Sequence, residues 1–240
     1  MVFGIVLAGG KGSRMGNTDM PKQFMKLGTK PILVHTVEKF FVNSRFEKVI
    51  VPTHKSWVEH ARNLIEKNIG QTDKVVVIDG GETRNDTIMN AIAYIEENYG
   101  LDDDTIVVTH DSVRPFVTHR IIDENIDCAA QYGACDTMVP AADTIVESRD
   151  GQGITSIPIR DHMYQGQTPQ SFKAKRLKEI FESLTDEEKD ILTDACKMYV
   201  LKGEHVHVLM GEVFNIKITY PFDMKVAQSL LGVTDELEGK

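Results

Sequence analysis

A glycine-rich, basic segment begins directly after the first apolar run of the chain. From residue 7 to residue 16 it reads Leu-Ala-Gly-Gly-Lys-Gly-Ser-Arg-Met-Gly. Glycines that follow a strand expose backbone N–H groups that can hold a phosphate, and Lys11, Arg14 and Lys22 add positive charge. We interpret the segment as a phosphate-binding loop. The alternative is a tight turn that needs glycine only for a positive φ.

Two well-known nucleotide-binding loops do not fit these residues. A P-loop requires a lysine directly after its last glycine, whereas Gly16 is followed by Asn17 and Thr18. A dinucleotide-binding loop requires G-x-G-x-x-G and an acidic residue at the end of the second strand, where this chain has Thr53 and His54. Neither a P-loop nor a nicotinamide-binding loop is therefore predicted.

A second glycine-bearing loop covers residues 79–87, Asp-Gly-Gly-Glu-Thr-Arg-Asn-Asp-Thr. Its amides and hydroxyls suit the recognition of a base edge or a ribose, because open α/β sheets bind ligands at the ends of their strands. The structural alternative is a helix N-cap at Thr83 or Asn85, and both interpretations can hold together.

A carboxylate and an arginine follow the next strand, in His110-Asp111-Ser112-Val113-Arg114-Pro115. Hard cations prefer carboxylate oxygens, so Asp111 could bind Mg²⁺ directly or through water. Arg114 could equally form a structural ion pair with it.

Further polar chemistry lies near the C-terminus. Strand-like alternation in residues 215–219 predicts that Asn215, Lys217 and Thr219 share one face, where the lysine and threonine could hold a second phosphate. His205 and His207 have no third candidate ligand nearby, so a catalytic zinc site is not predicted.

These polar segments require strands to position them. Short β-branched runs alternate with helical stripes of apolar residues, which is typical of βαβ units around a parallel sheet. The predicted strands are residues 4–8, 48–51, 75–79, 105–109 and 137–139, with 206–209 returning to the sheet. We predict a Rossmann-like α/β fold with a mostly parallel sheet flanked by helices.

The pattern changes at residues 141–167, which carry glycines and a proline between short β-like pieces. We interpret this stretch as an excursion from the sheet, a protruding β-arm within a single domain of residues 1–240. After it, Thr185 and Glu188 form a capping-box pattern that predicts the start of a helix.

Composition excludes several classes of protein. The 240 residues hold 27 Lys plus Arg against 36 Asp plus Glu, a net charge of −9. Proteins that coat nucleic acids or anionic membranes need a large positive field, so neither partner is expected.

No apolar run is long enough to span a bilayer, so no membrane insertion is expected. The three cysteines, Cys128, Cys135 and Cys196, contain no C-x-x-C pair and predict neither a disulfide framework nor a thiolate zinc site. We expect a cytoplasmic protein.

Taken together, the motifs resemble the cytidylyltransferases that make CDP-alcohols from CTP and a sugar-alcohol phosphate. The motifs that carry this resemblance span nearly the whole chain: residues 7–15, Pro21-Lys22-Gln23, 79–81, 110–115, Gln167-Thr168-Pro169-Gln170, Thr193-Asp194 and 216–219. The resemblance implies a nucleotidyltransferase-type fold.

Two branches of this family compete. Residues 7–10, 163–170 and 220–223 look more like the ribitol-5-phosphate branch of wall teichoic acid synthesis. The 2-C-methyl-D-erythritol 4-phosphate branch of isoprenoid synthesis usually has Pro-Ala-Ala-Gly in the first loop and His-Asp-Ala-Ala-Arg-Pro in the later one. We therefore expect transfer of the cytidylyl group to D-ribitol 5-phosphate, with the isoprenoid branch as the alternative.

The resemblance also implies roles for particular residues. Arg14 and Lys22 match the transition-state stabilisers, while Arg160 and Lys217 match the residues that hold the acceptor phosphate. Asp111 falls in the metal region, and Thr144 and Thr219 fall in the acceptor region. The residues that match the CTP-binding segments are Leu7, Ala8, Gly9, Gly10, Gly81, Glu82, Thr83, Arg84, Asn85, Asp86, Thr87 and Ser112.

The family further implies Mg²⁺, CTP and a pentitol phosphate as small-molecule partners, and a homodimer in which the excursion at 141–167 reaches the other copy. An alternative of another class is a non-catalytic nucleotide sensor or scaffold, because a fold alone does not determine function. The joint presence of Arg14, Lys22, Asp111 and Lys217 favours the enzyme.

Overall fold

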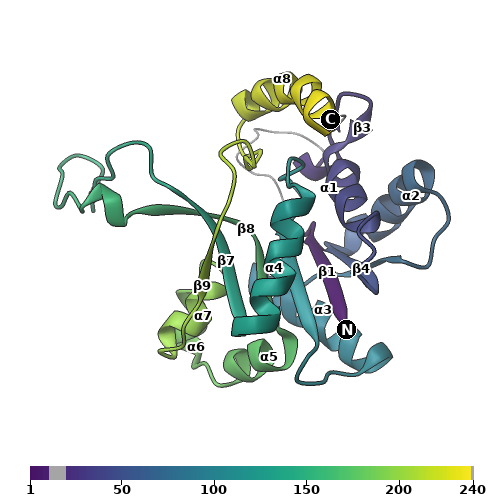
Figure 1. The fold of residues 1–240 in the computed structure, drawn as a ribbon, viewed down its shortest axis with the longest axis horizontal. Coiled ribbons are helices and arrows are strands. Elements are labelled where there is room, and N and C mark those ends of the chain that lie inside the picture. The colour runs from purple at the N-terminus through teal and green to yellow at the C-terminus, as the bar shows by residue number, and fades with distance from the viewer. Residues whose placement is uncertain (11–19, 239–240) are drawn as a thin grey trace.

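A twisted seven-stranded sheet forms the centre of the computed structural model, which describes residues 1–10 and 20–238 (Figure 1). Six strands run in one direction, and β8 is antiparallel to both of its neighbours. In spatial order the strands are β5 (Val75–Asp79), β4 (Lys48–Thr53), β1 (Val2–Leu7), β6 (Ile106–Asp111), β8 (Tyr164–Lys173), β7 (Ala134–Pro140) and β9 (His207–Met210). This confirms the predicted fold class.

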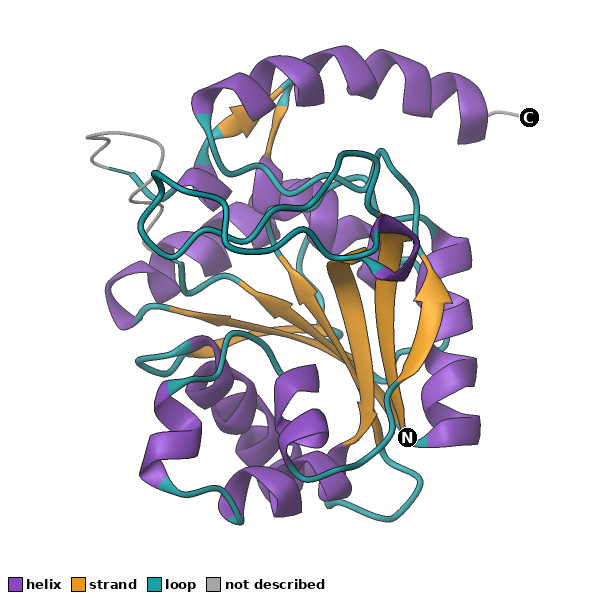
Figure 2. Cartoon of the chain, turned by 90° about the vertical axis from the view of Figure 1, so that its left-hand side faces the viewer, coloured by secondary structure: helices purple, strands orange, loops and turns teal. Residues whose placement is uncertain are grey.

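Helices cover both faces of the sheet (Figure 2). One face packs against α1 (Ile32–Phe41), α2 (Val58–Ile69) and α4 (His119–Tyr132). The other packs against α3 (Arg84–Tyr99), α5 (Ala174–Glu182) and α7 (Cys196–Leu201). The central strands are buried on both faces, which explains why they read as continuous apolar runs rather than as alternating ones.

Smaller elements complete the fold. A third apolar cluster joins the hairpin of β2 (Lys26–Leu27) and β3 (Lys30–Pro31) to the long C-terminal α8 (Pro221–Glu238). α6 (Asp186–Asp190) begins at the capping box of Thr185 and Glu188, as the sequence predicts. Within residues 1–10 and 20–238, single-turn 3₁₀ helices are η2 (Lys22–Phe24), η3 (Lys55–Trp57) and η4 (Arg160–His162).

Residues 141–163 leave the sheet as a projecting arm between β7 and β8 (Figure 1). Apart from η4, the regular pairing within this arm is one isolated bridge between Glu147 and Ser156. The predicted excursion extended to residue 167, which is wrong at its end because β8 begins at Tyr164. β8 was missed because its strand character comes from pairing with β6 and β7 and not from a local apolar run.

Candidate active site

A cavity of about 520 Å³ opens where β1, β5 and β6 end, at the edge of the sheet that parallel strands share. It is lined by Leu7, Gly9, Gly10, Lys22, Gln23, Gly81, Glu82, Thr83, Arg84, Thr87, Asp111, Ser112, Val113 and Lys217. The two glycine-bearing loops and the Asp111 segment, far apart in sequence, therefore line one site.

The first glycine loop is tied to the sheet and to η2. The Ala8 amide donates to Pro52 at 2.9 Å, and the Thr53 hydroxyl donates to the Ala8 carbonyl at 3.0 Å. The Gln23 amide donates to the carbonyls of Ala8 and Gly10, at 2.7 and 3.0 Å. Gln23 thus fixes the entry to the loop and carries its neighbour Lys22, which is buried, into the cavity wall.

The second glycine loop is shaped by the start of α3. Thr83 caps the helix in a capping box with Asp86, and the Thr87 hydroxyl accepts from the Gly81 amide at 3.0 Å. A Cβ added to Gly81 would lie 2.4 Å from the Cβ of Asp86, so only glycine fits there. The loop is therefore both a helix cap and a wall of the cavity, as the two sequence interpretations allowed together.

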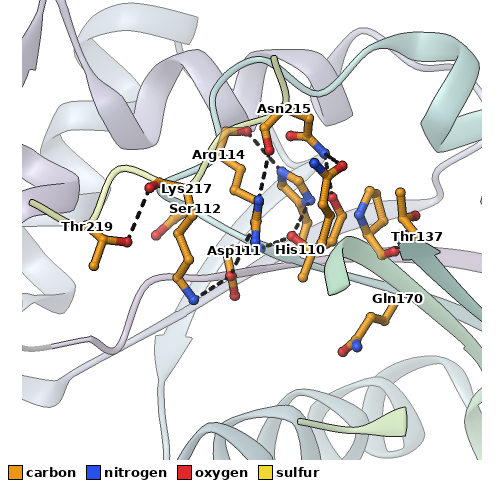
Figure 3. Close-up of polar contacts among 12 residues, drawn as sticks. His110, Asp111, Ser112, Arg114, Thr137, Gln170, Asn215, Lys217 and Thr219 are labelled. Atoms are coloured by element: carbon orange, nitrogen blue, oxygen red, sulfur yellow. Dashed lines mark hydrogen bonds and ion pairs between the residues drawn. The ribbon is translucent and has the colours of Figure 1, made fainter. Parts of the chain in front are cut away.

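Three cations surround Asp111 at the end of β6, and Figure 3 shows two of them, Arg114 and Lys217. The Lys217 ammonium lies 2.8 Å from Oδ2, Arg114 Nε lies 3.7 Å from Oδ2, and Arg84 Nε lies 3.6 Å from Oδ1. Burial by itself would raise the pKa of Asp111, but Arg84, Lys217 and Arg114 outweigh it and hold the pKa far below its ordinary value. The carboxylate is ionised, and the cluster carries an excess of positive charge.

A buried hydrogen-bond chain holds this carboxylate in place. The Asp111 amide donates to the Thr168 hydroxyl at 3.1 Å, and that hydroxyl lies 2.9 Å from His110 Nδ1. His110 Nε2 lies 3.0 Å from the Arg114 carbonyl, which can only accept, so Nε2 carries the proton. Burial lowers the pKa of His110 to about 4, so the ring is neutral and serves as a positioning group.

The donor set around Asp111 does not fit a protein-held Mg²⁺ ion. A cation there would face the side chains of Arg84, Arg114 and Lys217, all within 4 Å of the same carboxylate. In the described part of the chain, no three His, Cys, Asp or Glu residues lie close enough together to hold a metal. Of the two interpretations of Asp111, the geometry favours the ion pair.

A second, smaller cavity of about 180 Å³ adjoins the first. Its lining residues are Arg84, Asp111, Arg114, Gly166, Gln167, Thr168, Gln170, Thr193, Asp194 and Lys217. The two cavities share Arg84, Asp111 and Lys217, so the cation cluster stands between them.

The structure brings most of the predicted nucleotide-binding residues to the larger cavity. Those absent from its lining are Ala8, Asn85 and Asp86, which support the two loops from behind or within α3. Lys11 and Arg14 lie outside the described residues. Lys22 and Lys217 both line this cavity, and their roles at the substrate phosphates stay predictions.

Three predicted acceptor residues lie elsewhere. Arg160 and Thr144 are exposed on the arm and line neither cavity of this chain. Residues 215–219 form no strand, contrary to the predicted alternation, because their backbone pairs with loops instead of a sheet neighbour. Thr219 consequently donates to the Lys217 carbonyl and does not join the lysine side chain at Asp111 (Figure 3).

Several groups at the site were missed as site residues by the sequence interpretation. Gln167, Gln170 and Asp194 line the smaller cavity, although the sequence singled them out only as parts of family motifs. Arg114 is predicted only as an ion-pair partner of Asp111 and as part of a family motif. Asp136, beside Gln170, was not singled out, because nothing local distinguishes a carboxylate within a strand from any other polar position.

A mostly parallel sheet whose strand ends carry two glycine loops, a helix N-terminus and a cluster of cations defines a nucleotidyltransferase. The sequence matches the model of the family IspD: 2-C-methyl-D-erythritol 4-phosphate cytidylyltransferase over residues 2–233. The chain belongs to this family, whose members are CTP-dependent cytidylyltransferases, and it is an enzyme of that class.

Solved structures agree with this assignment. The 2-C-methyl-D-erythritol 4-phosphate cytidylyltransferase of Francisella tularensis is 29% identical, with a TM-score of 0.78 over 94% of this chain and 97% of that chain. The 4-diphosphocytidyl-2C-methyl-D-erythritol synthase of Anaerococcus prevotii is 24% identical, with a TM-score of 0.77 over 96% of each chain. The Thermus thermophilus cytidylyltransferase, at 22% identity, has a TM-score of 0.71 over 96% of this chain and 98% of that chain. The Anaerococcus prevotii and Thermus thermophilus structures share the fold of this chain.

Proposed function

We propose that this enzyme transfers the cytidylyl group of CTP to D-ribitol 5-phosphate, which gives CDP-ribitol and pyrophosphate. The observation that carries the proposal is the pair of adjoining cavities that share Arg84, Asp111 and Lys217. Two phosphorylated substrates can meet at this one cation cluster. A place in teichoic acid synthesis depends on this acceptor and is part of the same proposal.

The lining of the smaller cavity supports an unbranched polyol as the acceptor. Its described residues are charged, amide and hydroxyl side chains and one glycine, with no apolar side chain among them. A pentitol phosphate offers a hydroxyl on every carbon that is not esterified and can pair with such a surface. Methylerythritol phosphate instead carries a methyl branch, which gains nothing from polar walls.

The chemistry follows from the placement of charge. An oxygen of the acceptor phosphate attacks the α-phosphorus of CTP in line, a new P–O bond forms, and the bond to the β-phosphate breaks to release pyrophosphate. Negative charge increases around the five-coordinate phosphorus. We assign its stabilisation to Lys22 from the larger cavity and to Lys217, Arg84 and Arg114 from the cluster, together with Arg14.

The second candidate acceptor is 2-C-methyl-D-erythritol 4-phosphate. The matching family and the Francisella tularensis structure both carry its name, so the comparisons support it more directly than they support ribitol 5-phosphate. Both candidates are acyclic polyol monophosphates that require the same cation cluster, and they differ in one hydroxyl and one methyl branch.

The discriminating experiment offers the purified enzyme CTP and Mg²⁺ with each acceptor separately and measures pyrophosphate release. We expect a kcat/KM for D-ribitol 5-phosphate at least about 100-fold above that for methylerythritol phosphate, the equivalent of about 3 kcal/mol. The reverse preference would establish the second candidate, and release with neither would contradict both.

We propose that Mg²⁺ arrives with CTP, held by triphosphate oxygens and water, as is usual for this ion at nucleotide sites. Omission of Mg²⁺ should then abolish turnover. An enzyme that retains full activity in excess chelator would contradict the requirement.

We also propose that residues 1–240 act as one domain within a homodimer. Exposed apolar side chains on the arm, such as Ile154, Ile157 and Ile159, support this proposal because such patches mark interfaces. Arg160 and Thr144 would then reach the acceptor cavity of the other copy. Co-expressed Arg160→Ala and Lys217→Ala chains should recover activity that neither variant has alone, and failure to recover any would contradict a shared site.

A further inference from the structure

Asp136 is a buried carboxylate on β7 that the proposed chemistry does not use. Only 8% of the residue is exposed, and it forms no ion pair with any described residue. Its Oδ1 accepts a hydrogen bond from the Gln170 amide at 3.1 Å, and the thiol of Cys196 also contacts it. A buried charge without a cation is costly, so it is expected to persist only where it serves a purpose.

This carboxylate lies behind the wall of the smaller cavity. Gly166 and Gln170, both on β8, line that cavity and flank Asp136. A Cβ built on Gly166 would stand 4.0 Å from Asp136 Oδ2, so this oxygen lies next to a glycine of the cavity wall, although Asp136 itself does not line the cavity. A carboxylate has about four acceptor positions, so the contacts with Gln170 and Cys196 leave capacity for a further donor.

Charged side chains of both signs line the smaller cavity. Arg84, Arg114 and Lys217, which surround Asp111, form an end with excess positive charge that suits the acceptor phosphate. Asp194 and, behind Gly166, Asp136 form an acidic end. The side chain of Gln170 connects the two ends of the cavity. Its Oε1 accepts a hydrogen bond from Arg84 at 3.3 Å, and its Nε2 donates to Asp136.

We propose that Asp136 is a specificity-determining residue that accepts a hydrogen bond from the terminal hydroxyl of the pentitol phosphate. This inference rests on the proposed function. With the phosphate at the basic end, the far end of an extended polyol points toward the acidic end. A hydroxyl donates to a carboxylate, and the pentitol has one more hydroxyl than the branched tetritol. The contact therefore selects for chain length.

The surroundings of Asp136 support this role. Burial, with a smaller contribution from Asp194, raises its pKa to about 6, although Gln170, Cys196 and Arg84 act in the opposite direction. The carboxyl is thus ionised at neutral pH but poorly stabilised there by the protein. A donated hydroxyl would supply the missing partner, which is a condition for a strong charge-assisted hydrogen bond.

The test uses the full-length Asp136→Asn and Asp136→Ala variants, with Asp190→Asn as a control at an exposed acid of α6. We expect kcat/KM for D-ribitol 5-phosphate to fall about 10- to 100-fold in both Asp136 variants, mainly through the acceptor KM, with the KM for CTP within twofold. Erythritol 4-phosphate, which lacks the terminal carbon, provides the decisive comparison. The kcat/KM of the unmodified enzyme should be lower by a similar factor with erythritol 4-phosphate than with D-ribitol 5-phosphate. The Asp136 variants should show little difference in kcat/KM between these two acceptors.

The outcomes separate this inference from the proposed function. Failure of the unmodified enzyme to use ribitol 5-phosphate would refute the acceptor and this inference with it. An active enzyme whose Asp136 variants keep the same preference for the pentitol over the tetritol would refute this inference alone. Equal losses for both acceptors, with a raised KM for CTP and a lower melting temperature, would show a structural role and also overturn it.

Discussion

Replacement of Asp136 by asparagine should stabilise the folded protein at neutral pH. The substitution keeps the shape of the side chain and an oxygen for the Gln170 amide, but it removes a buried charge that has no cationic partner among the described residues. Deletion of an unpaired buried charge relieves its desolvation cost. The same change is expected to weaken acceptor binding, so stability and function would move in opposite directions.

The size of the stabilisation expected from Asp136→Asn follows from the pKa of Asp136. Burial raises the pKa of Asp136 from its ordinary value of 3.8 to about 6. A difference of about two pKa units corresponds to about 3 kcal/mol by which the folded state disfavours the ionised form. For a chain of this length, each kcal/mol shifts the melting temperature by about 2–4 °C, so a gain of several degrees is expected.

The pKa also determines the direction in which the contribution of Asp136 to the free energy of unfolding changes with pH. Between about pH 4 and pH 6 the folded state binds the Asp136 proton and the unfolded state does not, so this residue lowers stability as pH rises through that window. The cost is fully present above about pH 6 and absent below about pH 4, where the carboxyl is protonated in both states. The variant should therefore gain stability at about pH 8 and none at about pH 4.

Denaturant unfolding of both proteins at these two pH values measures the effect, with Asp190→Asn as the exposed control that should change little. A variant that is less stable than the unmodified protein at about pH 8 would refute the reasoning, because the carboxylate would then make a net favourable contact. An equal gain at both pH values would show that packing, and not ionisation, is responsible.

Three further predictions test the site. Lys22→Ala should lower kcat at least about 100-fold with the fold intact by circular dichroism, and near-normal turnover would exclude its role. Lys217→Ala removes the 2.8 Å partner of Asp111 and should raise the acceptor KM more than the CTP KM in steady-state kinetics, so unchanged acceptor parameters would count against it. Gly81→Ala places a Cβ 2.4 Å from Asp86, so it should raise the KM for CTP and lower the free energy of unfolding by about 1–3 kcal/mol; wild-type CTP binding by calorimetry would contradict this.

Local signals in the sequence were sufficient for much of the fold. β5 has the predicted bounds, and the capping boxes at Thr83 and Thr185 start α3 and α6. The glycine loops could be interpreted as ligand-binding loops because glycines after a strand expose backbone N–H groups, although a tight turn or a helix cap was an open alternative. Each of these features depends on residues within a few positions of one another, so periodicity and composition reveal them.

The tertiary structure decided what depends on distant pairs. β8 is a strand only because it inserts between β6 and β7, and Arg84 reaches Asp111 only because α3 and β6 meet at one sheet edge. Arg160 lies on the arm, outside the cavities of its own chain, although its residue type suited a phosphate site. The sequence by itself determined which chemical groups were present and which local elements carried them. Only the packing of those elements brought three cations to Asp111 and placed Asp136 behind the second cavity, because interactions between residues far apart in the chain leave no local pattern.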